Sequence, residues 1–356
     1  MDHTYTEDER MIGEAAQALF DQHCPMTAIR DFIESGAQSP LGAEALGQSG
    51  LLGVVATADA DGAALGAAAA LQVVTAAATH LAPFPVADAI VAAAMLAQSH
   101  TDAARDVIAG RRLIVIAPGE PLPVDAAGRV SGWIAALPYA LAADAVVIAT
   151  DGPDGTGHRL IDLARPGVTC TRQTGIDPSF PLGDLLLEGV ETGAEDEVGP
   201  VDPRWDRLRV ILMAGELMAA AQVCLNLAVD YMKVRRQFGH EIGKFQALKH
   251  IAANGALGIE SMKAAIDYAA WAHDQDDADA AMSASIAKSY ASDHARRVAE
   301  DALQCHGAIG FTWDYDLQLY MRRILRLAAS GGTVRAHRAE IARMLRDRIG
   351  MEQDAR

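Results

Sequence analysis

The sequence predicts a mainly helical α+β protein in three parts: an N-terminal helical domain (residues 1–110), a small middle β domain (111–200) and a C-terminal four-helix bundle (201–356). Two observations predict this order. Apolar residues repeat with helical spacing in the first and last parts, whereas in the middle they gather in short runs rich in β-branched residues. A chain of 356 residues is long enough for two or three such units.

The first part reads as helices separated by turns. Apolar residues recur at helical spacing over residues 9–20, and the segments 64–78 and 86–97 are rich in alanine, the strongest helix former. Pro83 and Pro85 separate the two alanine-rich segments. We therefore expect several helices before residue 110.

The middle part contains three runs that predict strands, namely LIVIA (113–117), AVVIAT (145–150) and HRLIDL (158–163). The turn-forming run DGPDGTG (151–157) separates the last two. Strands and helices do not alternate here, so the pattern favours a small antiparallel β domain over a doubly wound fold. The acidic run 191–200, which contains glycine, predicts a linker to the last part.

The last part returns to long helical patterns with short breaks between them. Four stretches with short connections are typical of an antiparallel helical bundle. The predicted helices cover residues 204–238, 243–273, 279–305 and 314–346, with breaks at FGHEIG, DQDDAD, GAIGFTW and SGG.

Composition limits the class of protein. The chain carries a formal charge of −17, and its acidic start resembles neither a signal peptide nor a transit peptide. No window holds about 18 apolar residues free of charge. We therefore expect a cytoplasmic protein that neither inserts into membranes nor binds nucleic acid, because its charge repels polyanions. Cys24, Cys170, Cys224 and Cys305 lie far apart and are expected to stay reduced.

Charge is unevenly distributed along the chain. Residues 1–110 hold 3 basic and 14 acidic side chains (3 − 14 = −11), residues 111–202 hold 6 and 14 (−8), and residues 203–356 hold 21 and 19 (+2). Within the last part, the segment Tyr231–His250, here called the basic island, has five Lys/Arg and one Glu. If the chain binds an anion, its cations are expected in this last part.

The basic island has two interpretations. Lys233, Arg235 and Arg236 end a predicted helix, where cations complement the helix dipole without any ligand. A second motif, QCHGAIGF (304–311), favours a ligand. Glycines allow close approach of the backbone, and amide, guanidinium and main-chain donors together suit a pyrophosphate. Motifs of zinc proteases, serine hydrolases and P-loop proteins are absent.

At these two places the sequence resembles the acyl-CoA dehydrogenase family. The first family pattern, Y-x-x-x-R-x-x-F-G-x-x-I-x-x-F-Q, is matched by Tyr231, Arg235, Phe238, Gly239, Ile242, Phe245 and Gln246. The second, Q-x-x-G-x-x-G-F before an arginine-bearing helix, is matched by Gln304, Gly307, Gly310, Phe311 and Arg322–Arg323. The resemblance implies the predicted fold, FAD as cofactor and dehydrogenation of an acyl-CoA between its α and β carbons.

The resemblance also implies which residues hold FAD. Arg235, Phe238 and Gln304 would contact the pyrophosphate and adenosine parts of a flavin bound by a neighbouring subunit. Ala308 stands where many members have a second glycine. The further residues implied at the cofactor are Ile242, Phe245, Gly307, Ala308, Thr333 and Arg335.

The usual catalytic residues are missing. The reaction needs a carboxylate that removes the α proton. The usual glutamate position holds Gly331, and the alternative position, 26 residues before Arg235, holds Arg209. No catalytic residue is therefore assigned, although Asp206 or Glu216 remains open as an unconventional base.

The middle domain departs from the family as well. Where members have a Thr-Glu-Pro loop and a Trp-Ile-Thr strand beside the flavin ring, this chain reads VIAPGEPLPVD (115–125) and GWIAALPYALAAD (132–144). The hydroxyl donors are missing, and we expect Trp133 to be a core or turn residue. Residues that would hold the chain's own flavin ring are thus absent, whereas those that would serve a neighbour's flavin are present.

This pattern favours one subunit of a heteromeric α2β2 acyl-CoA dehydrogenase. Its partner, a second acyl-CoA dehydrogenase-like chain, would carry the glutamate, and FAD would lie at the interface. Members of this kind commonly act on bulky acyl-CoAs such as steroid side-chain thioesters. Two alternatives remain open: a self-sufficient homo-oligomeric enzyme, and a flavin-free binding or scaffold protein that keeps the fold.

Overall fold

The computed structural model describes residues 5–36, 39–153 and 155–354, with side chains as far as residue 350. The chain divides into two compact units. The sheet unit comprises residues 5–73 and 82–209, and the bundle unit comprises residues 74–81 and those from Val210 on. Secondary structure changes from helix to strand between Ile108 and Ile114, and back between Pro200 and Pro203. The three domain boundaries read from the sequence stay predictions.

Helices form the first part of the chain, as predicted. The first begins with a capping box, in which Thr6 Oγ1 accepts a hydrogen bond from the Glu9 N–H (3.2 Å) while the Glu9 carboxylate accepts one from the Thr6 N–H (2.8 Å). All residues of the α5 helix are buried, and all but Asp88 are apolar. The helices are α1 (Glu7–His23), α2 (Met26–Ser35), α3 (Ala43–Ser49), α4 (Ala67–Thr79), α5 (Val86–Leu96) and α6 (Thr101–Ile108).

The strands form two sheets, and the prediction of a purely antiparallel domain is wrong. Strands β1 and β2 both pair with β4 in parallel, because β3, which lies in the second sheet, comes between them and β4 along the chain. The first sheet contains β1 (Ile114–Ile116), β2 (Leu122–Pro123), β4 (Ala145–Gly152), β5 (Gly155–Asp162) and β8 (Glu197–Pro200). The second, antiparallel sheet contains β3 (Arg129–Pro138), β7 (Leu182–Glu191) and β6 (Val168–Gln173), in this spatial order.

The predicted linker at 191–200 is wrong too. Glu191 is the last residue of β7, Ala194–Asp196 forms a 3-10 turn, and Glu197–Pro200 is β8, which pairs with β5. The acidic residues are held there because Arg165 and Arg159 pair with Asp196 and Glu197, respectively. The prediction of a linker rested on the acidic composition alone, and the segment is instead an ordered strand.

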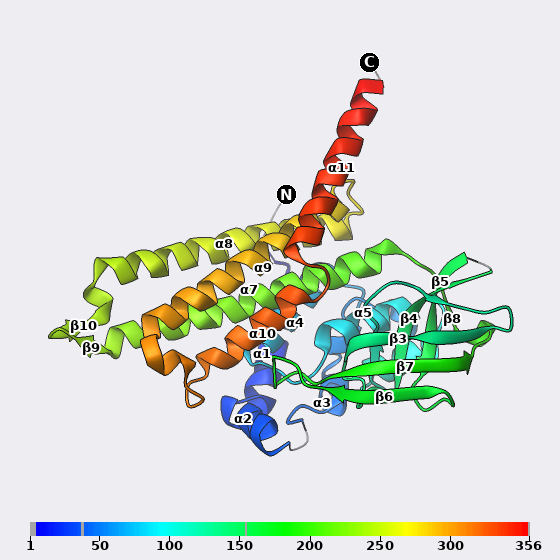
Figure 1. The fold of residues 1–356 in the computed structure, drawn as a ribbon, viewed down its shortest axis with the longest axis horizontal. Coiled ribbons are helices and arrows are strands. Elements are labelled where there is room, and N and C mark those ends of the chain that lie inside the picture. The colour runs from blue at the N-terminus through cyan, green and yellow to red at the C-terminus, as the bar shows by residue number, and fades with distance from the viewer. Residues whose placement is uncertain (1–4, 37–38, 154, 355–356) are drawn as a thin grey trace. The chain divides into compact units, whose positions relative to one another are not determined.

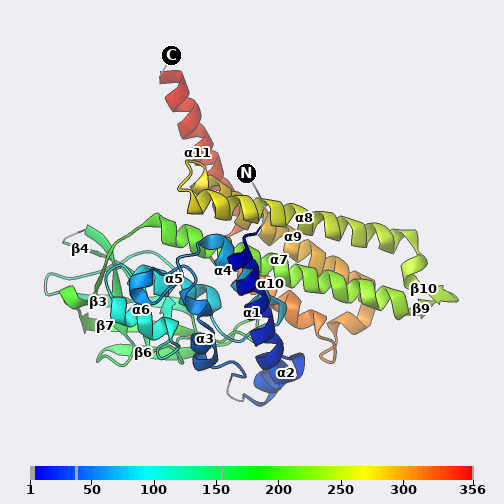
Figure 2. The same cartoon turned by 180° about the vertical axis from the view of Figure 1, so that it is seen from behind.

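Long helices form the bundle, as predicted, and Figures 1 and 2 both show α7, α8, α9 and α10 side by side. The fourth predicted stretch forms two helices, which separate at the predicted SGG break, where Gly331 (φ 64°) and Gly332 (φ 95°) are left-handed. The helices are α7 (Pro203–Val234), α8 (Gln246–Asp274), α9 (Ala280–His306), α10 (Leu317–Ala329) and α11 (Val334–Asp354). A short hairpin, β9 (Arg236–Gln237) and β10 (His240–Glu241), joins α7 to α8.

One described helix, α7, is long and apolar enough to cross a membrane by length and composition, with a mean hydropathy of 1.7 over its best window. Its apolar stretch contains Glu216, so it does not contradict the expectation that no such window is free of charge. Its window is 67% buried inside the protein, as expected for the central helix of a bundle. The four cysteines form no disulfide among the described residues.

Candidate functional site

The basic island forms the end of α7 and the hairpin that follows it. The Arg235 N–H donates to the Tyr231 carbonyl (2.9 Å), and the Arg235 carbonyl accepts from the Ile242 N–H (2.8 Å). This second bond closes the chain back on itself and leaves Phe238 (φ 52°) and Gly239 (φ 82°) at the tip in left-handed conformations. Left-handed backbone is unfavourable for phenylalanine, so the hairpin holds Phe238 in a strained position.

Most cations of the island are neutralised within the chain. Glu241 lies 3.1 Å from Arg236 and 3.4 Å from Lys244, and Lys233 lies 2.8 Å from Asp230. Hydrogen bonding from its own backbone N–H, followed by the charge of Arg236, holds the pKa of Glu241 below its ordinary value.

Two cations of the island have no hydrogen-bond or ion-pair partner for their side chains among the described residues, Arg235 and Lys249, and both are exposed. Arg235 adjoins the strained tip of the hairpin, whereas Lys249 lies on the first turn of α8. The island therefore presents Arg235 as an exposed guanidinium without a counter-charge among the described residues.

Two phenylalanines of the basic island lie on the hairpin and just after it. Phe238 is 88% exposed and Phe245 is 37% exposed, and their rings meet edge to face with centroids 6.1 Å apart. Ile242, by contrast, is buried at the start of the 3-10 turn that follows the hairpin. A phenylalanine that is held in a strained backbone and left almost wholly in solvent is expected at a surface that another molecule covers.

The end of α9 carries the second motif. Gln304 is exposed, and the helix ends at Gly307, whose φ of 64° and ψ of −144° suit glycine alone. The Gly307 N–H caps the helix on the carbonyls of Leu303 and Gln304. Ala308 is exposed, as is Phe311 at 71%.

The structure brings these two motifs together. The Tyr231 ring, one turn before Arg235, stacks on His306, two residues after Gln304, with centroids 4.5 Å apart. The two motifs therefore share one end of the bundle. Seven of the nine predicted cofactor residues lie at this end, here called the cofactor edge: Arg235, Phe238, Ile242, Phe245, Gln304, Gly307 and Ala308.

The other two predicted cofactor residues, Thr333 and Arg335, lie elsewhere. They are exposed at the start of α11, just after Gly332, whose carbonyl lies 3.5 Å from Lys288 Nζ. Lys288 precedes Gln304 by 16 residues on α9, a distance of about 24 Å along the helix. One chain cannot use both groups on the same part of one ligand.

The sequence predicts that Gly331 stands at the usual position of the family's catalytic base, and the structure shows a tight, strained site there. A Cβ on Gly331 would lie 2.7 Å from Met213 Sδ, and the φ of 64° disfavours any residue but glycine. The Gly331 carbonyl lies 2.8 Å from His337 Nε2, which holds the turn in place.

Arg209, which the sequence places at the alternative base position, forms a buried ion pair. Arg209 and Asp88 are both buried, with Arg209 Nε 2.5 Å from Asp88 Oδ1, and Arg209 Nη2 donates to the Ile116 carbonyl (3.2 Å). A buried guanidinium that is already paired cannot remove a proton.

The two substitute bases lie in different units of the chain. Asp206 is exposed in the first turn of α7, within the sheet unit, where its charge acts on His158. Glu216 is buried further along α7 in the bundle unit. Neither environment is the one expected for a carboxylate that faces a ligand.

The prediction for Trp133 is wrong. Trp133 lies in the middle of β3 opposite Leu186 and is 59% exposed, so it is neither a core residue nor a turn residue. Alternation along the strand places Ile134 inward and Trp133 outward, a pattern that is hidden in the sequence because the next residues are apolar on both faces.

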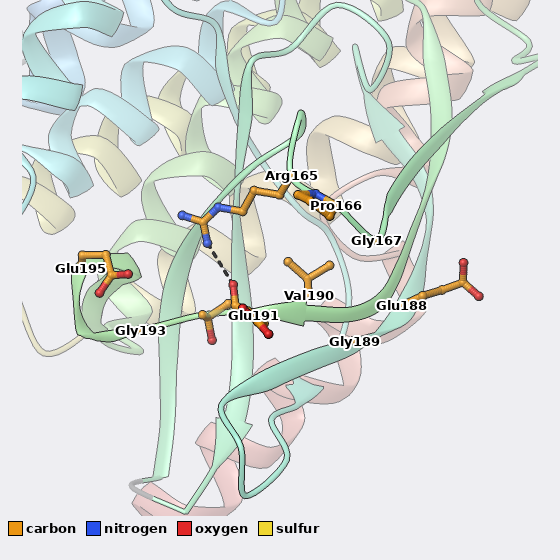
Figure 3. A pocket seen from close by; sticks show the side chains of 10 residues that line it. Arg165, Pro166, Gly167, Glu188, Gly189, Val190, Glu191, Gly193 and Glu195 are labelled. Carbon is orange, nitrogen blue, oxygen red and sulfur yellow. Dashed lines mark hydrogen bonds between the residues drawn. The ribbon is translucent and has the colours of Figure 1, made fainter.

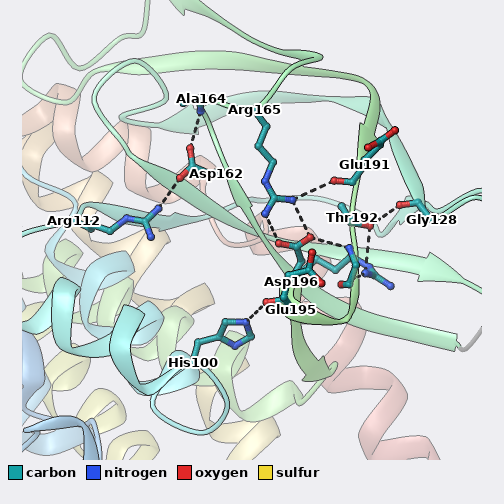
Figure 4. Close-up of polar contacts among 12 residues, drawn as sticks. His100, Arg112, Gly128, Asp162, Ala164, Arg165, Glu191, Thr192, Glu195 and Asp196 are labelled. Atoms are coloured by element: carbon teal, nitrogen blue, oxygen red, sulfur yellow. Dashed lines mark hydrogen bonds and ion pairs between the residues drawn. The ribbon is translucent and has the colours of Figure 1, made fainter.

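The sheet unit also contains a hollow of about 670 Å³ that the sequence did not indicate. Figure 3 shows the side chains of Glu188 and Glu195 at opposite sides of it, with Arg165 between them. Arg165 is engaged by Asp196 and by the Glu191 carbonyl, as Figure 4 shows. Carboxylates thus dominate the rim, which repels the phosphates of FAD or CoA.

Comparison with known proteins places the chain in a family. The family model "Acyl-CoA dehydrogenase, C-terminal domain" matches residues 206–346. The acyl-CoA dehydrogenase IpdE2 of Mycobacterium tuberculosis is 31% identical over 90% of this chain and 92% of its own length. The chain belongs to the acyl-CoA dehydrogenase family. The acyl-CoA dehydrogenase FadE34 of the same organism is also 31% identical, over 85% of this chain, but the match covers only 42% of that larger relative.

Solved acyl-CoA dehydrogenase structures confirm the fold. The ChsE4–ChsE5 complex of Mycobacterium tuberculosis superposes with a TM-score of 0.89 at 22% identity, covering 97% of this chain and 99% of that chain. The Tcur3481–Tcur3483 steroid acyl-CoA dehydrogenase variant gives 0.87 at 24% identity, with the same coverage. A glutaryl-CoA dehydrogenase of Mycobacterium smegmatis in complex with FADH2 gives 0.86 at 16% identity, covering 96% of this chain and 95% of that chain.

Proposed function

We propose that this chain is one subunit of a heteromeric, FAD-dependent acyl-CoA dehydrogenase, and that it completes a flavin site on a partner chain. The observation that carries the proposal is an asymmetry in what the chain retains. At the cofactor edge, Arg235 is exposed without a partner among the described residues and Phe238 is 88% exposed. At the predicted base position stands Gly331, where a side chain would be strained by the φ of 64° and would have to displace Met213.

The residues of the cofactor edge fit a flavin pyrophosphate. Arg235 offers a planar fork of donors suited to phosphate oxygens, and Gln304 adds a neutral amide. The Gly307 backbone allows close approach, because nothing within 4 Å would meet even a Cβ there. When bound, FAD accepts the hydride of the dehydrogenation. The part of this chain is to bind and orient the cofactor's phosphate end and to shield it from water.

The partner is proposed to be a second acyl-CoA dehydrogenase-like chain that supplies the glutamate base. Complexes of two different chains occur among the similar structures, the ChsE4–ChsE5 complex being one. A thioester of a bulky acyl group such as a steroid side chain is proposed as substrate, since another similar structure is a steroid acyl-CoA dehydrogenase. We also propose that the complex is cytoplasmic and acts without nucleic acid or membrane insertion.

The test is the flavin content of the chain co-purified with its partner. Arg235→Ala is expected to lower FAD retention at least about tenfold, because one charge-assisted bidentate contact is worth about 1.5–3 kcal/mol. Lys249→Ala is the matched control, since Lys249 is the other exposed cation of the island without a partner among the described residues. Absorbance near 450 nm measures both.

Three results contradict the proposal in different ways. Equal flavin loss from both variants would mean a general electrostatic effect. Flavin and activity in the chain alone would favour a self-sufficient enzyme, with Glu216 and Asp206 as the next variants. Absence of flavin from every preparation would favour the scaffold alternative.

A further inference from the structure

A layer of three rings lies beneath the cofactor edge. His306, the last residue of α9, stacks on Tyr231 of α7 with centroids 4.5 Å apart and planes inclined by 22°. Its other neighbour is Tyr315, from the loop before α10, at 4.7 Å. The two tyrosines themselves are 6.3 Å apart. Residues of α7, of the end of α9 and of the loop before α10 therefore meet at one imidazole.

The hydrogen bond of His306 fixes its tautomer. Nδ1 lies 2.7 Å from the Ala302 carbonyl, which can only accept, so Nδ1 carries the proton. Nε2 of a neutral imidazole is then a bare acceptor. It is fully buried and has no hydrogen-bond partner among the described residues, and His306 as a whole is 5% exposed. A proton on Nε2 would be buried without an acceptor, which is costly.

The groups that face His306 do not offset that cost. Tyr231 and Tyr315 contribute neutral rings, and the carboxylates nearest this layer, Asp230 and Asp316, act on Tyr315. On its own helix, the Ala302 carbonyl is already bonded to Nδ1. Burial lowers the pKa of His306 and raises that of Tyr315, so the whole layer is uncharged at neutral pH.

We propose that His306 is a positioning residue: as a neutral ring between Tyr231 and Tyr315, it holds the flavin-binding groups of α7 and α9 at a fixed separation, and its protonation loosens them. Arg235 follows Tyr231 by one turn, and Gln304 precedes His306 by two residues, so a shift of the stacked rings moves both. This inference rests on the proposed function and adds to it a dependence of flavin binding on pH.

The test measures FAD affinity of the complex at pH 7.5 and pH 5.5. The wild-type complex is expected to bind about tenfold more weakly at pH 5.5, as one proton enters the layer. His306→Phe keeps a stacked ring that cannot be protonated, and is expected to bind flavin within about threefold of wild type at pH 7.5 with no loss at pH 5.5. His306→Leu removes the stack and is expected to bind weakly at both pH values.

The control is His250→Phe, at an exposed histidine on α8 within the basic island, which is expected to keep the wild-type pH response. Circular dichroism at each pH separates loosening of the edge from unfolding. Wild-type affinity that does not change with pH overturns the inference without any variant. A pH response that persists in His306→Phe also overturns the inference. In both cases, flavin loss from Arg235→Ala would still support the proposed function. A wild-type complex without flavin at pH 7.5 would contradict both.

Discussion

At the scale of single residues, the structure accommodates the two residues that the sequence predicts at the family's base positions, Gly331 and Arg209. Gly331 fits a left-handed turn against Met213, where a side chain would be strained and would have to displace that methionine. Arg209 is buried against Asp88 of α5 and the Ile116 carbonyl of β1. These residues are built into their surroundings, so restoring a base by one substitution would disturb the packing as well as the chemistry.

The Arg209–Asp88 pair gives a stability prediction. Asp88→Ala is expected to lower the free energy of unfolding by about 3–5 kcal/mol, because it leaves a buried guanidinium without its counter-charge. Asp102→Ala is the matched control: Asp102 pairs with Arg105 at 3.2 Å but is 97% exposed, so its loss is expected to cost less than about 1 kcal/mol. Urea denaturation measures both, and equal losses would refute a special role for the buried pair.

At the scale of elements, long periodic segments were predictable and short ones were not. The patterns of α7, α8 and α9 extend over many turns, so their existence followed from apolar spacing. Strands such as β2 and β6 were not predicted, because two to six residues with mostly exposed side chains show little hydrophobic pattern. Family motifs located the cofactor edge, but they could not reveal that Thr333 lies far from it, since that distance is set by the length of α9.

The turn between α10 and α11 is held by a buried cation. Lys288 is fully buried, and its Nζ donates to Ser292 Oγ and to the Leu327 carbonyl, each at 3.1 Å. No carboxylate pairs with it among the described residues. Burial lowers its pKa to about 8, from an ordinary value of 10.5.

This shift predicts how stability changes in alkaline solution. Between pH 8 and 10.5 the unfolded chain binds the Lys288 proton and the folded chain releases it, so this residue's contribution to stability rises with pH. From pH 7.5 to 10, wild type is expected to gain on the order of 1–3 kcal/mol relative to Lys288→Met. Comparing the two proteins cancels the opposite contribution of the buried cysteines and tyrosines. A stability difference between wild type and Lys288→Met that stays constant across this range would disprove the prediction. Lys249→Met, at an exposed lysine, is the control and is expected to differ from wild type by a constant amount.

At the scale of the whole molecule, acid sensitivity is expected to come first from histidines and only later from carboxylates. Burial is the largest cause that lowers the pKa of each of four histidines: His158, His294, His306 and His337. Their folded pKa values lie below the unfolded value of about 6.5, so the unfolded chain binds more protons in that range. Stability is therefore complete above pH 6.5 and falls as the pH drops through the folded values. Asp196, whose pKa is lowered beside Arg165, adds a second loss below about pH 4.

The whole-molecule prediction is an unfolding temperature that declines in two steps as pH falls, the first beginning below about pH 6.5. Replacing His158 and His337 together with glutamine is expected to shrink the first step and leave the second, because the amides do not titrate. His250→Gln, at an exposed site, is the control and should leave both steps unchanged. The net charge, −17 at neutral pH, becomes less negative as the pH falls. Thermal melts at constant ionic strength keep the screening of charges the same in every sample. A single step below pH 4 would assign acid sensitivity to carboxylates alone, and a first step that survives the double variant would exclude these two histidines as its source.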